Sequence, residues 1–183
     1  NSAESAAKLI KYMKEKSLRY DVIGRGSNLI VSDEGYDGII LLFGNDFSGI
    51  EINENTIRCK AGTLLASVCV NAQQSSLTGM ENLFGIPGTV GGALFMNAGA
   101  YGGEMKDIVI SAEYIDENGE IRTIKKDEMN LSYRHSIFSD SDYIITSVTI
   151  ELSDGNSDEI KAHMTECMAK RSSKQPLEYP SAG

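Results

Sequence analysis

A glycine-rich stretch from Gly85 to Gly103 constrains this chain more than any other part of its sequence. It reads G-I-P-G-T-V-G-G-A-L-F-M-N-A-G-A-Y-G-G, and seven of its 19 residues are glycine. It carries no charge and only one proline, so it is not typical of a flexible linker. Because glycine has no Cβ, backbone N–H groups can come within hydrogen-bonding distance of a large, flat or anionic ligand. The stretch therefore predicts a cradle for a phosphate-bearing cofactor. The alternative is a tight crossing between two packed elements.

The composition narrows the class of protein. The 183 residues are 41% hydrophobic and 23% charged, which suits one large domain or one domain with part of another. The net charge of −9 argues against a general nucleic-acid binder, which normally shows a basic stripe. No apolar run approaches the roughly 20 residues that cross a bilayer, so we expect no membrane partner. The cysteines are odd in number and lack metal-ligand spacing, which indicates free thiols, a reducing cytoplasmic compartment and no metal; they are Cys59, Cys69 and Cys167.

The first third of the chain combines helical and strand patterns. Apolar residues at i, i+3, i+4 and i+7 predict a helix over Ala3–Lys16, capped by Ser2 or Ser5. Thr63 is a candidate cap for a second helix with an apolar face formed by Leu65, Val68, Cys69 and Ala72. Short apolar runs predict strands at Tyr20–Ile23, Leu29–Val31, Gly38–Phe43, Ile50–Ile52 and Thr56–Cys59, the last two as a hairpin.

Past the glycine-rich stretch, strand patterns predominate. Ile108–Asp116 and Glu120–Ile124 flank an Asn-Gly turn and predict a hairpin, and Tyr143–Leu152 predicts a long strand. A final helix is expected from Ser157, with an apolar stripe formed by Ile160, Met164, Cys167 and Met168. His163 lies beside that stripe and is predicted to be a surface or core-edge residue rather than a metal ligand.

A second small-residue turn, Gly24 to Asn28, follows the strand at Tyr20–Ile23. Its backbone N–H groups, hydroxyl and carboxamide make it a second candidate cradle. It is neither a Rossmann fingerprint, because residue 29 is leucine and no long helix follows, nor a P-loop, because no Gly-Lys-Ser/Thr follows. In the glycine-rich stretch, Pro87 is expected in the first turn of a short helix whose free N–H groups would meet a pyrophosphate.

Three motifs occur together in the order and spacing of a known family. They are Gly24-Arg25-Gly26-Ser27-Asn28-Leu29, Gly85–Gly92 followed by Asn97–Gly102, and Tyr133-Arg134-His135-Ser136-Ile137-Phe138. Together they resemble the UDP-N-acetylenolpyruvoylglucosamine reductases, flavin enzymes of peptidoglycan precursor synthesis. The resemblance covers essentially the whole chain. It implies an α+β, FAD-binding fold of the vanillyl-alcohol-oxidase type, in which two α/β subdomains hold the cofactor and a third domain covers the substrate.

The resemblance also implies how the chain divides. Residues 1–60 would be the remainder of the first FAD-binding subdomain, residues 61–172 the second, and residues 173–183 the start of a linker to a substrate domain that this sequence lacks. The first strand and helix of the flavin domain would precede Asn1, so we expect a sequence truncated at both ends. The proton-donating serine of the family would directly follow Gly183, and its late glutamate would lie in the substrate domain. Ser181 is assigned no role, and no turnover is expected from this polypeptide alone.

Carried over position by position, the resemblance implies noncovalently bound FAD. The Gly24–Asn28 turn would hold its pyrophosphate, and Gly85–Gly92 with Asn97–Gly102 would line the flavin and its phosphates. The residues assigned to the cofactor are Gly24, Arg25, Gly26, Ser27, Asn28, Leu29, Gly85, Ile86, Pro87, Gly88, Thr89, Gly91, Gly92, Asn97, Gly99, Ala100, Tyr101 and Gly102. Covalent attachment is not expected, because His135 belongs to the Arg134 motif rather than to a cradle turn.

The resemblance implies a two-step reduction of UDP-N-acetylglucosamine enolpyruvate to UDP-N-acetylmuramate. NADPH passes a hydride to FAD, reduced FAD passes it to C3 of the enolpyruvyl ether, and C2 is then protonated. Arg134 is the candidate for binding the substrate carboxylate, because a planar guanidinium matches a carboxylate and stabilises developing negative charge. Tyr133 either hydrogen-bonds the substrate or packs beneath it. The alternative for Arg134 is an exposed arginine beside Tyr133.

Two other functions are consistent with the glycine turns. The chain could be a non-catalytic or degenerate flavin- or nucleotide-binding module that keeps the cradle. It could also belong to another oxidoreductase of the same flavin fold, which has no particular reason to keep the Tyr-Arg-His-Ser-Ile-Phe motif. A catalytic origin requires Arg134 to converge with Gly85–Gly103 on one substrate position.

Overall fold

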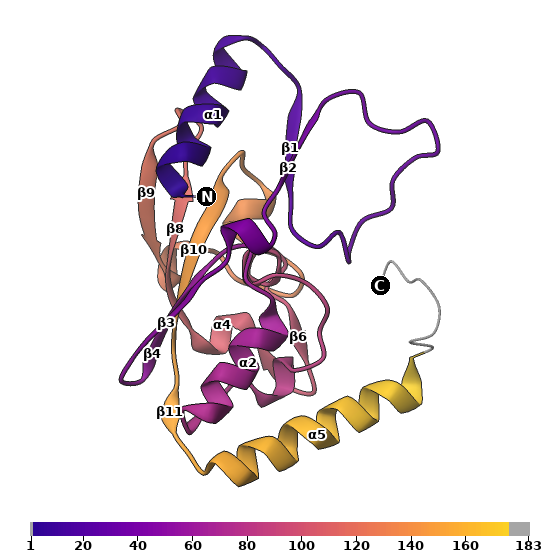
Figure 1. Ribbon diagram of the computed structural model, residues 1–183, viewed down its shortest axis with the longest axis vertical. Coiled ribbons are helices and arrows are strands. Elements are labelled where there is room, and N and C mark those ends of the chain that lie inside the picture. The colour runs from indigo at the N-terminus through magenta and orange to yellow at the C-terminus, as the bar shows by residue number, and fades with distance from the viewer. Residues whose placement is uncertain (1, 176–183) are drawn as a thin grey trace.

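A computed structural model describes residues 2–175 and combines helices with one five-stranded antiparallel sheet (Figure 1). The order of its strands is β3-β4-β10-β8-β9. They are β3 (Ile50–Asn53), β4 (Thr56–Lys60), β8 (Val109–Ile115), β9 (Ile121–Lys125) and β10 (Ile144–Glu151). The predicted α+β class is confirmed. The division at residue 60 stays a prediction, and the sheet contains strands from both sides of it.

Helices and small strand pairs surround this sheet. The helices are α1 (Ala3–Glu15), α2 (Leu65–Gln74), α3 (Val90–Phe95), α4 (Met105–Ile108) and α5 (Ser157–Lys174), with short 3-10 turns η1 (Asn45–Phe47), η2 (Glu81–Leu83), η3 (Lys126–Glu128) and η4 (Ile137–Ser139). The pairs are β1 (Tyr20–Ile23) with β2 (Ile39–Leu42), β5 (Leu77–Thr78) with β11 (Ser153–Asp154), and β6 (Gly99–Ala100) with β7 (Gly103–Glu104). Among residues 2–175, none of the helices has the length and apolar composition needed to cross a bilayer.

The main core joins the large sheet to α2, α3, η2 and α5. Ile57 on β4 and Val148 on β10 are fully buried, as are Leu65 and Val68 on α2. Burying each such side chain contributes roughly 1.5–3 kcal/mol. A second, smaller cluster forms where Ile10 and its neighbours on α1 pack against Ile115, which leaves α1 beside the β8–β9 side of the sheet (Figure 1). The sheet therefore has a well-packed framework from which the loops described below extend.

The predicted helices and the hairpin strands are confirmed, with ends shifted by a few residues. The predicted strand Leu29–Val31 is wrong, because these residues lie in the irregular loop between β1 and β2, which projects from the body in Figure 1. Ile30 is 88% exposed. A strand needs a hydrogen-bonding neighbour, and β1 pairs in parallel directly with β2 instead. The strand propensity of Leu29–Val31 was therefore not enough to make this segment a strand.

Two predicted helix starts are also wrong. The α2 helix begins at Leu65, and Thr63 Oγ1 bonds the amide and carbonyl of Gly49, at 3.0 and 3.1 Å, rather than capping the helix. The α3 helix begins at Val90, beyond Pro87, with Thr89 as its N-cap. At α1 the cap is Ser2, whose side chain accepts from the Ser5 amide. A hydroxyl near a helix start bonds the best available partner, and for Thr63 that partner comes from another element.

The turn of the β8–β9 hairpin is closed by the carboxylate of Asp116. Its Oδ1 accepts from the amides of Asn118 and Glu120, both at 2.9 Å, and its Oδ2 accepts from Arg122 Nε at 3.2 Å. The Glu120 amide, then Arg122 and the Asn118 amide, hold the pKa of Asp116 below its ordinary value of 3.8. The stabilisation is therefore fully present above that value and is lost as the pH falls through the lower, folded-state pKa.

We expect Asp116→Asn to lower the free energy of unfolding at pH 7 by about 1–2 kcal/mol, since bonds to a charged acceptor are replaced by weaker ones. The loss should shrink as the pH falls below 3.8 and should vanish below the lower, folded-state pKa, where the wild-type carboxylate is protonated in both the folded and the unfolded state. Urea unfolding at pH 7 and at acid pH measures both effects. Glu117→Gln, an exposed substitution in the same turn, is the control. Equal destabilisation by Asp116→Asn at both pH values would contradict this account.

Candidate functional site

The two predicted cradle turns contact each other. Ser27 Oγ donates to the Pro87 carbonyl at 3.0 Å, although the two residues are 60 positions apart. A Cβ at Gly88 would lie 3.1 Å from Ser27 Oγ, and a Cβ at Gly24 would overlap Thr89 Oγ1. The small side chains at these positions thus allow the two backbones to approach closely. The structure therefore brings the two turns together.

Both turns keep backbone donors without a protein acceptor. Within residues 2–175, seven backbone amides in these turns donate to no protein acceptor. They are the amides of Arg25, Gly26, Ser27, Asn28, Gly85, Gly88 and Thr89. Three of these residues have positive φ, at +71° for Gly26, +88° for Gly85 and +131° for Gly88. Such conformations let a short loop direct amides into a concave anion site. Free backbone N–H groups on two adjoining turns can donate hydrogen bonds to the oxygens of a phosphate group.

The expected free amides at the start of α3 are not found. Val90 N donates to the Thr63 carbonyl at 2.8 Å, Gly91 N to the Ala61 carbonyl at 2.9 Å, and Gly92 N to Thr89 Oγ1 at 3.3 Å. The start of α3 is thereby bonded to the segment between β4 and α2. The free donors lie before this helix rather than in its first turn.

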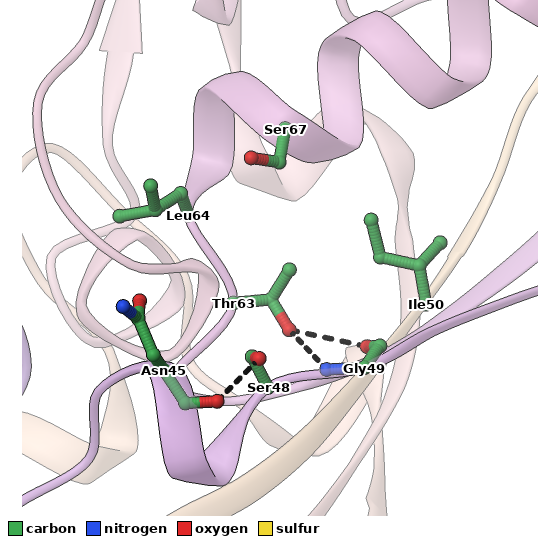
Figure 2. Close-up of a pocket in the computed structure, with 7 residues that line it drawn as sticks. All are labelled: Asn45, Ser48, Gly49, Ile50, Thr63, Leu64 and Ser67. Carbon is green, nitrogen blue, oxygen red and sulfur yellow. Dashed lines mark hydrogen bonds between the residues drawn. The ribbon is translucent and has the colours of Figure 1, made fainter.

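A pocket of about 320 Å³ adjoins this arrangement (Figure 2). It is lined by Asn45, Ser48, Gly49, Ile50, Thr63, Leu64 and Ser67. Figure 2 shows Thr63 bonded to Gly49 and Ser48 bonded to the Asn45 carbonyl. Leu64 also forms a β-bridge to Thr89, which connects the pocket to the glycine-rich stretch. This pocket was not predicted from the sequence, where its signal is a short run of small and polar residues around Ser48.

A second pocket, of about 360 Å³, includes Gly102 but has an acidic wall. Glu104, Asp107 and Glu151 all line it. Like charges repel, so these carboxylates disfavour a phosphate there. The phosphate-binding role predicted for the stretch therefore fits the Gly85–Thr89 part better than the Gly102 part.

Arg134 lies in a tight, exposed turn. Ser132 and His135 pair through two backbone hydrogen bonds, at 3.1 and 3.2 Å, and Tyr133 and Arg134 form the tip between them. Arg134 has φ +55°, an unusual conformation for a residue with a long side chain. Tyr133 is 83% exposed, and the Arg134 guanidinium carbon lies 5.9 Å from the centre of its ring. Both side chains are thus accessible to a ligand.

This turn is bonded to the second half of the glycine-rich stretch. Asn97 Nδ2 donates to the Ser132 carbonyl at 2.8 Å, and buried Ser136 Oγ donates to the Phe95 carbonyl at 2.7 Å. The structure therefore brings the Arg134 turn against residues 95–97, whereas the Gly24–Asn28 turn contacts residues 87–89. The two contacts lie at opposite ends of the short helix α3.

A carboxylate lies close to the Arg134 turn. Glu104 Oε2 accepts from Lys106 Nζ and from Asn97 Nδ2, both at 2.8 Å. The bond from Lys106, then the bond from Asn97 and the charge of Arg134, hold the pKa of Glu104 below its ordinary value of 4.5. The same carboxylate raises the pKa of Lys106. Glu104 is therefore ionised at neutral pH beside the arginine.

The remaining predicted residues are placed by other elements. Gly99 and Ala100 form β6, and Tyr101 and Gly102, with φ +52° and +90°, form the tip before β7. These strands contact η2, which ends at Leu83, two residues before Gly85. A Cβ at Gly85 would lie 3.1 Å from the Met168 sulfur and 3.4 Å from Arg171 Cδ, both on α5. The contact between α5 and the site was not predicted from the sequence; the sequence signal for it is the pair of basic residues near the end of α5, Lys170 and Arg171.

Other candidate chemistry is not supported by the geometry. All three cysteines are free, as predicted, and all three are buried; burial raises the pKa of Cys59 and Cys69 to about 12. These thiols are therefore protonated and unreactive at neutral pH. Across residues 2–175, no three His, Cys, Asp or Glu side chains are grouped so as to bind a metal ion. His163 is exposed, as expected. The predictions about Ser181 and Gly183 lie outside the described residues.

Comparison with known proteins gives the family. Residues 1–125 match the model of a family described as the FAD binding domain. The chain belongs to the FAD-binding domain family. The alignment spans the Gly24–Asn28 turn and the whole glycine-rich stretch, which are the segments with free amide donors.

Two relatives of this FAD-binding domain carry the same name. The chain is 46% identical to the UDP-N-acetylenolpyruvoylglucosamine reductase of Agathobacter rectalis, over 97% of the chain and 60% of that protein. It is 44% identical to the enzyme of the same name from Clostridium novyi, over 100% of the chain and 59% of that protein. The chain thus spans about 60% of the length of these curated relatives. The resemblance predicted from the three motifs is confirmed.

Solved structures support the same fold. The crystal structure of UDP-N-acetylenolpyruvylglucosamine reductase from Thermus caldophilus matches with a TM-score of 0.83 and 32% identity, over 97% of this chain and 63% of that one. The 6-hydroxy-D-nicotine oxidase of Arthrobacter nicotinovorans matches with a TM-score of 0.64 and 20% identity, over 84% and 35%, which shows a shared fold alone. The predicted FAD-binding fold of the vanillyl-alcohol-oxidase type is confirmed.

Proposed function

We propose that this chain is the FAD-binding part of an NADPH-dependent reductase that converts UDP-N-acetylglucosamine enolpyruvate to UDP-N-acetylmuramate. The observation that carries this proposal is the contact between two turns with free amide donors. Ser27 bonds Pro87 across them, and two relatives that match 97% and 100% of the chain are named UDP-N-acetylenolpyruvoylglucosamine reductases. The subdomain division predicted from the sequence, residues 1–60, 61–172 and 173–183, forms part of the proposal.

The residues present fit a dinucleotide cofactor. Neither Gly24–Asn28 nor Gly85–Gly92 contains a carboxylate, and Arg25 is their only charged residue. Bound FAD would supply the hydride-transfer chemistry. The chain would hold its phosphates with the amides of Arg25–Asn28 and of Gly85, Gly88 and Thr89, and it would need no covalent bond to do so.

Arg134 is proposed to bind the substrate carboxylate. Its guanidinium is exposed and lies next to an exposed aromatic ring, so a ligand can reach both. The fixed charge would stabilise negative charge that develops on the carboxylate and C2 during reduction. Tyr133 would contact the same part of the substrate. A reducing, cytoplasmic setting is part of this proposal and is supported by the three free thiols.

Two measurements on two polypeptides test the proposal. The chain itself is titrated with FAD, and binding is followed by flavin fluorescence. The natural gene product that contains this chain is assayed for NADPH oxidation that depends on the enolpyruvyl substrate. Flavin absorbance and substrate-dependent oxidation are expected in the gene product. A gene product that lacks flavin after reconstitution overturns the proposal, and one that binds flavin without oxidising NADPH favours the non-catalytic module.

Ser27→Ala tests the contact between the turns. The substitution removes the bond to the Pro87 carbonyl, so we expect about five- to tenfold weaker FAD binding, equivalent to roughly one net hydrogen bond. Ser32→Ala is the matched control, because Ser32 lies in the same loop and, among the described residues, its hydroxyl bonds only within that loop, where it accepts from the Glu34 amide. Equal FAD affinity in the two variants would show that the Ser27 bond does not shape the cradle.

A further inference from the structure

We propose that Asn97 and Glu104 are positioning residues that hold the Arg134 turn against the glycine-rich stretch, so that Arg134 meets an anionic substrate group in one orientation. The inference rests on the role proposed above for Arg134. It assigns Asn97 a task other than the cofactor contact expected from its motif, and it adds Glu104, which the sequence did not indicate.

The side chain of Asn97 is fully occupied by protein groups. Its Nδ2 donates to the Ser132 carbonyl and to Glu104 Oε2, both at 2.8 Å, and its Oδ1 accepts from the Lys106 amide at 2.8 Å. Asn97 is only 2% exposed. A carboxamide has two N–H donors, and both are used. Asn97 thus has no donor left for a cofactor, and its longest-range bond goes to the turn that carries Arg134.

The Arg134 turn needs external support. Arg134 has φ +55°, and such conformations persist in residues other than glycine only where the surrounding structure enforces them. The turn has its own Ser132–His135 backbone pair, and its side chains at the tip are exposed. The bonds from Asn97 to Ser132 and from Ser136 to Phe95 fix one end each. Of these two, only the Asn97 bond is also coupled to a charged group.

Glu104 supplies that charge. Its Oε2 atom is shared by Asn97 Nδ2 and Lys106 Nζ, so it orients the Asn97 carboxamide toward Ser132. The carboxylate therefore acts on the turn through the hydrogen-bonded chain that runs from Glu104 through Asn97 to Ser132.

Asn97→Gly is the decisive substitution. Asn97 has φ +40°, and glycine adopts positive φ without strain, so the change removes three side-chain bonds and keeps the backbone. Asn130→Gly is the matched control. Asn130 has φ +50°, is exposed, and has no side-chain hydrogen bond within residues 2–175.

The first readout is limited trypsin digestion of the 183-residue chain. We expect cleavage after Arg134 to accelerate about five- to tenfold in Asn97→Gly, the ratio that losing roughly one net hydrogen bond gives. Cleavage after Arg25, in the other turn, should not change. Glu104→Gln should accelerate cleavage after Arg134 less. Equal cleavage patterns in Asn97→Gly and Asn130→Gly would overturn the proposal, and so would equal acceleration after Arg25 and Arg134, which indicates general loss of stability.

The second readout uses the natural gene product. Asn97→Gly should leave FAD affinity unchanged and alter the kinetic constants for the enolpyruvyl substrate, raising its KM or lowering kcat. A loss of FAD affinity without faster cleavage after Arg134 would instead support the direct cofactor contact and would overturn the positioning role. If the wild-type gene product has no substrate-dependent activity, the proposed function fails, whereas the digestion still decides whether Asn97 holds the turn.

Discussion

Arg134→Lys in the natural gene product is expected to lower kcat for substrate-dependent NADPH oxidation by about 10²- to 10³-fold, since removing one preorganised donor to a developing anion costs roughly 3 kcal/mol. Lysine keeps the charge but lacks the planar fork that binds both carboxylate oxygens. The tip of the turn is exposed, so the substitution should not disturb the core. Stopped-flow reduction of the flavin by NADPH should be unaffected, because the change acts at the second half-reaction.

Arg58→Lys is the control for this prediction. Arg58 is exposed on β4 and pairs with Glu51 at 4.0 Å and Glu113 at 3.6 Å. Exposed pairs of this kind contribute about 0–1 kcal/mol, so activity should be retained. If Arg134→Lys and Arg58→Lys both kept the wild-type kcat and KM, the guanidinium of Arg134 would have no role in the reaction, and the exposed-arginine alternative would stand.

The elements that could be predicted from the sequence are those set by local periodicity. The β8–β9 hairpin follows from alternation around an Asn-Gly turn, and α1 follows from apolar spacing with a serine cap. The strand expected at Leu29–Val31 does not form because an apolar run becomes a strand only beside a hydrogen-bonding neighbour, and no local signal shows that β1 pairs with β2. The prediction that Thr63 caps α2 was wrong for the same reason, since its hydrogen-bond partner Gly49 lies 14 residues away.

In the candidate site, too, the local features could be predicted from the sequence and the tertiary contacts could not. Each small-residue turn could be recognised in the sequence. The bond from Ser27 to Pro87 joins residues 60 positions apart, so the contact between the turns could not be predicted from either turn alone. The free amides were expected in the first turn of α3, yet Ala61 and Thr63 accept from that turn, so the free donors lie earlier. The position of the Arg134 turn depends on Asn97, which contacts it across 35 residues. Tertiary hydrogen bonds thus decide which predicted donors are available to a ligand.

The adjacent glycines Gly91 and Gly92 differ in how much space a Cβ atom would have. A Cβ at Gly91 would lie 2.8 Å from Ala61 Cβ and 3.1 Å from the Ala61 carbonyl oxygen. A Cβ at Gly92 would meet only Thr89 Oγ1, at 3.5 Å, in ordinary contact, and Gly92 is exposed. Packing within the described chain therefore requires glycine at position 91 and does not require it at position 92. Alanine is the better helix former, so the glycine at 92 needs another reason, and close approach of the cofactor supplies one.

Gly91→Ala and Gly92→Ala are therefore expected to act in opposite directions on stability. Gly91→Ala should lower the free energy of unfolding by about 1–3 kcal/mol, because it overpacks the contact with Ala61. Gly92→Ala should raise it by about 0.5–1 kcal/mol through helix propensity, and yet weaken FAD binding by about tenfold or more, because a methyl group displaces a ligand held by the backbone. Urea unfolding without FAD and fluorescence titration with FAD measure the two effects separately. A Gly92→Ala chain that is more stable and binds FAD with wild-type affinity would show that the cofactor does not approach α3 closely, and the cradle would then be confined to the free amides of the two turns.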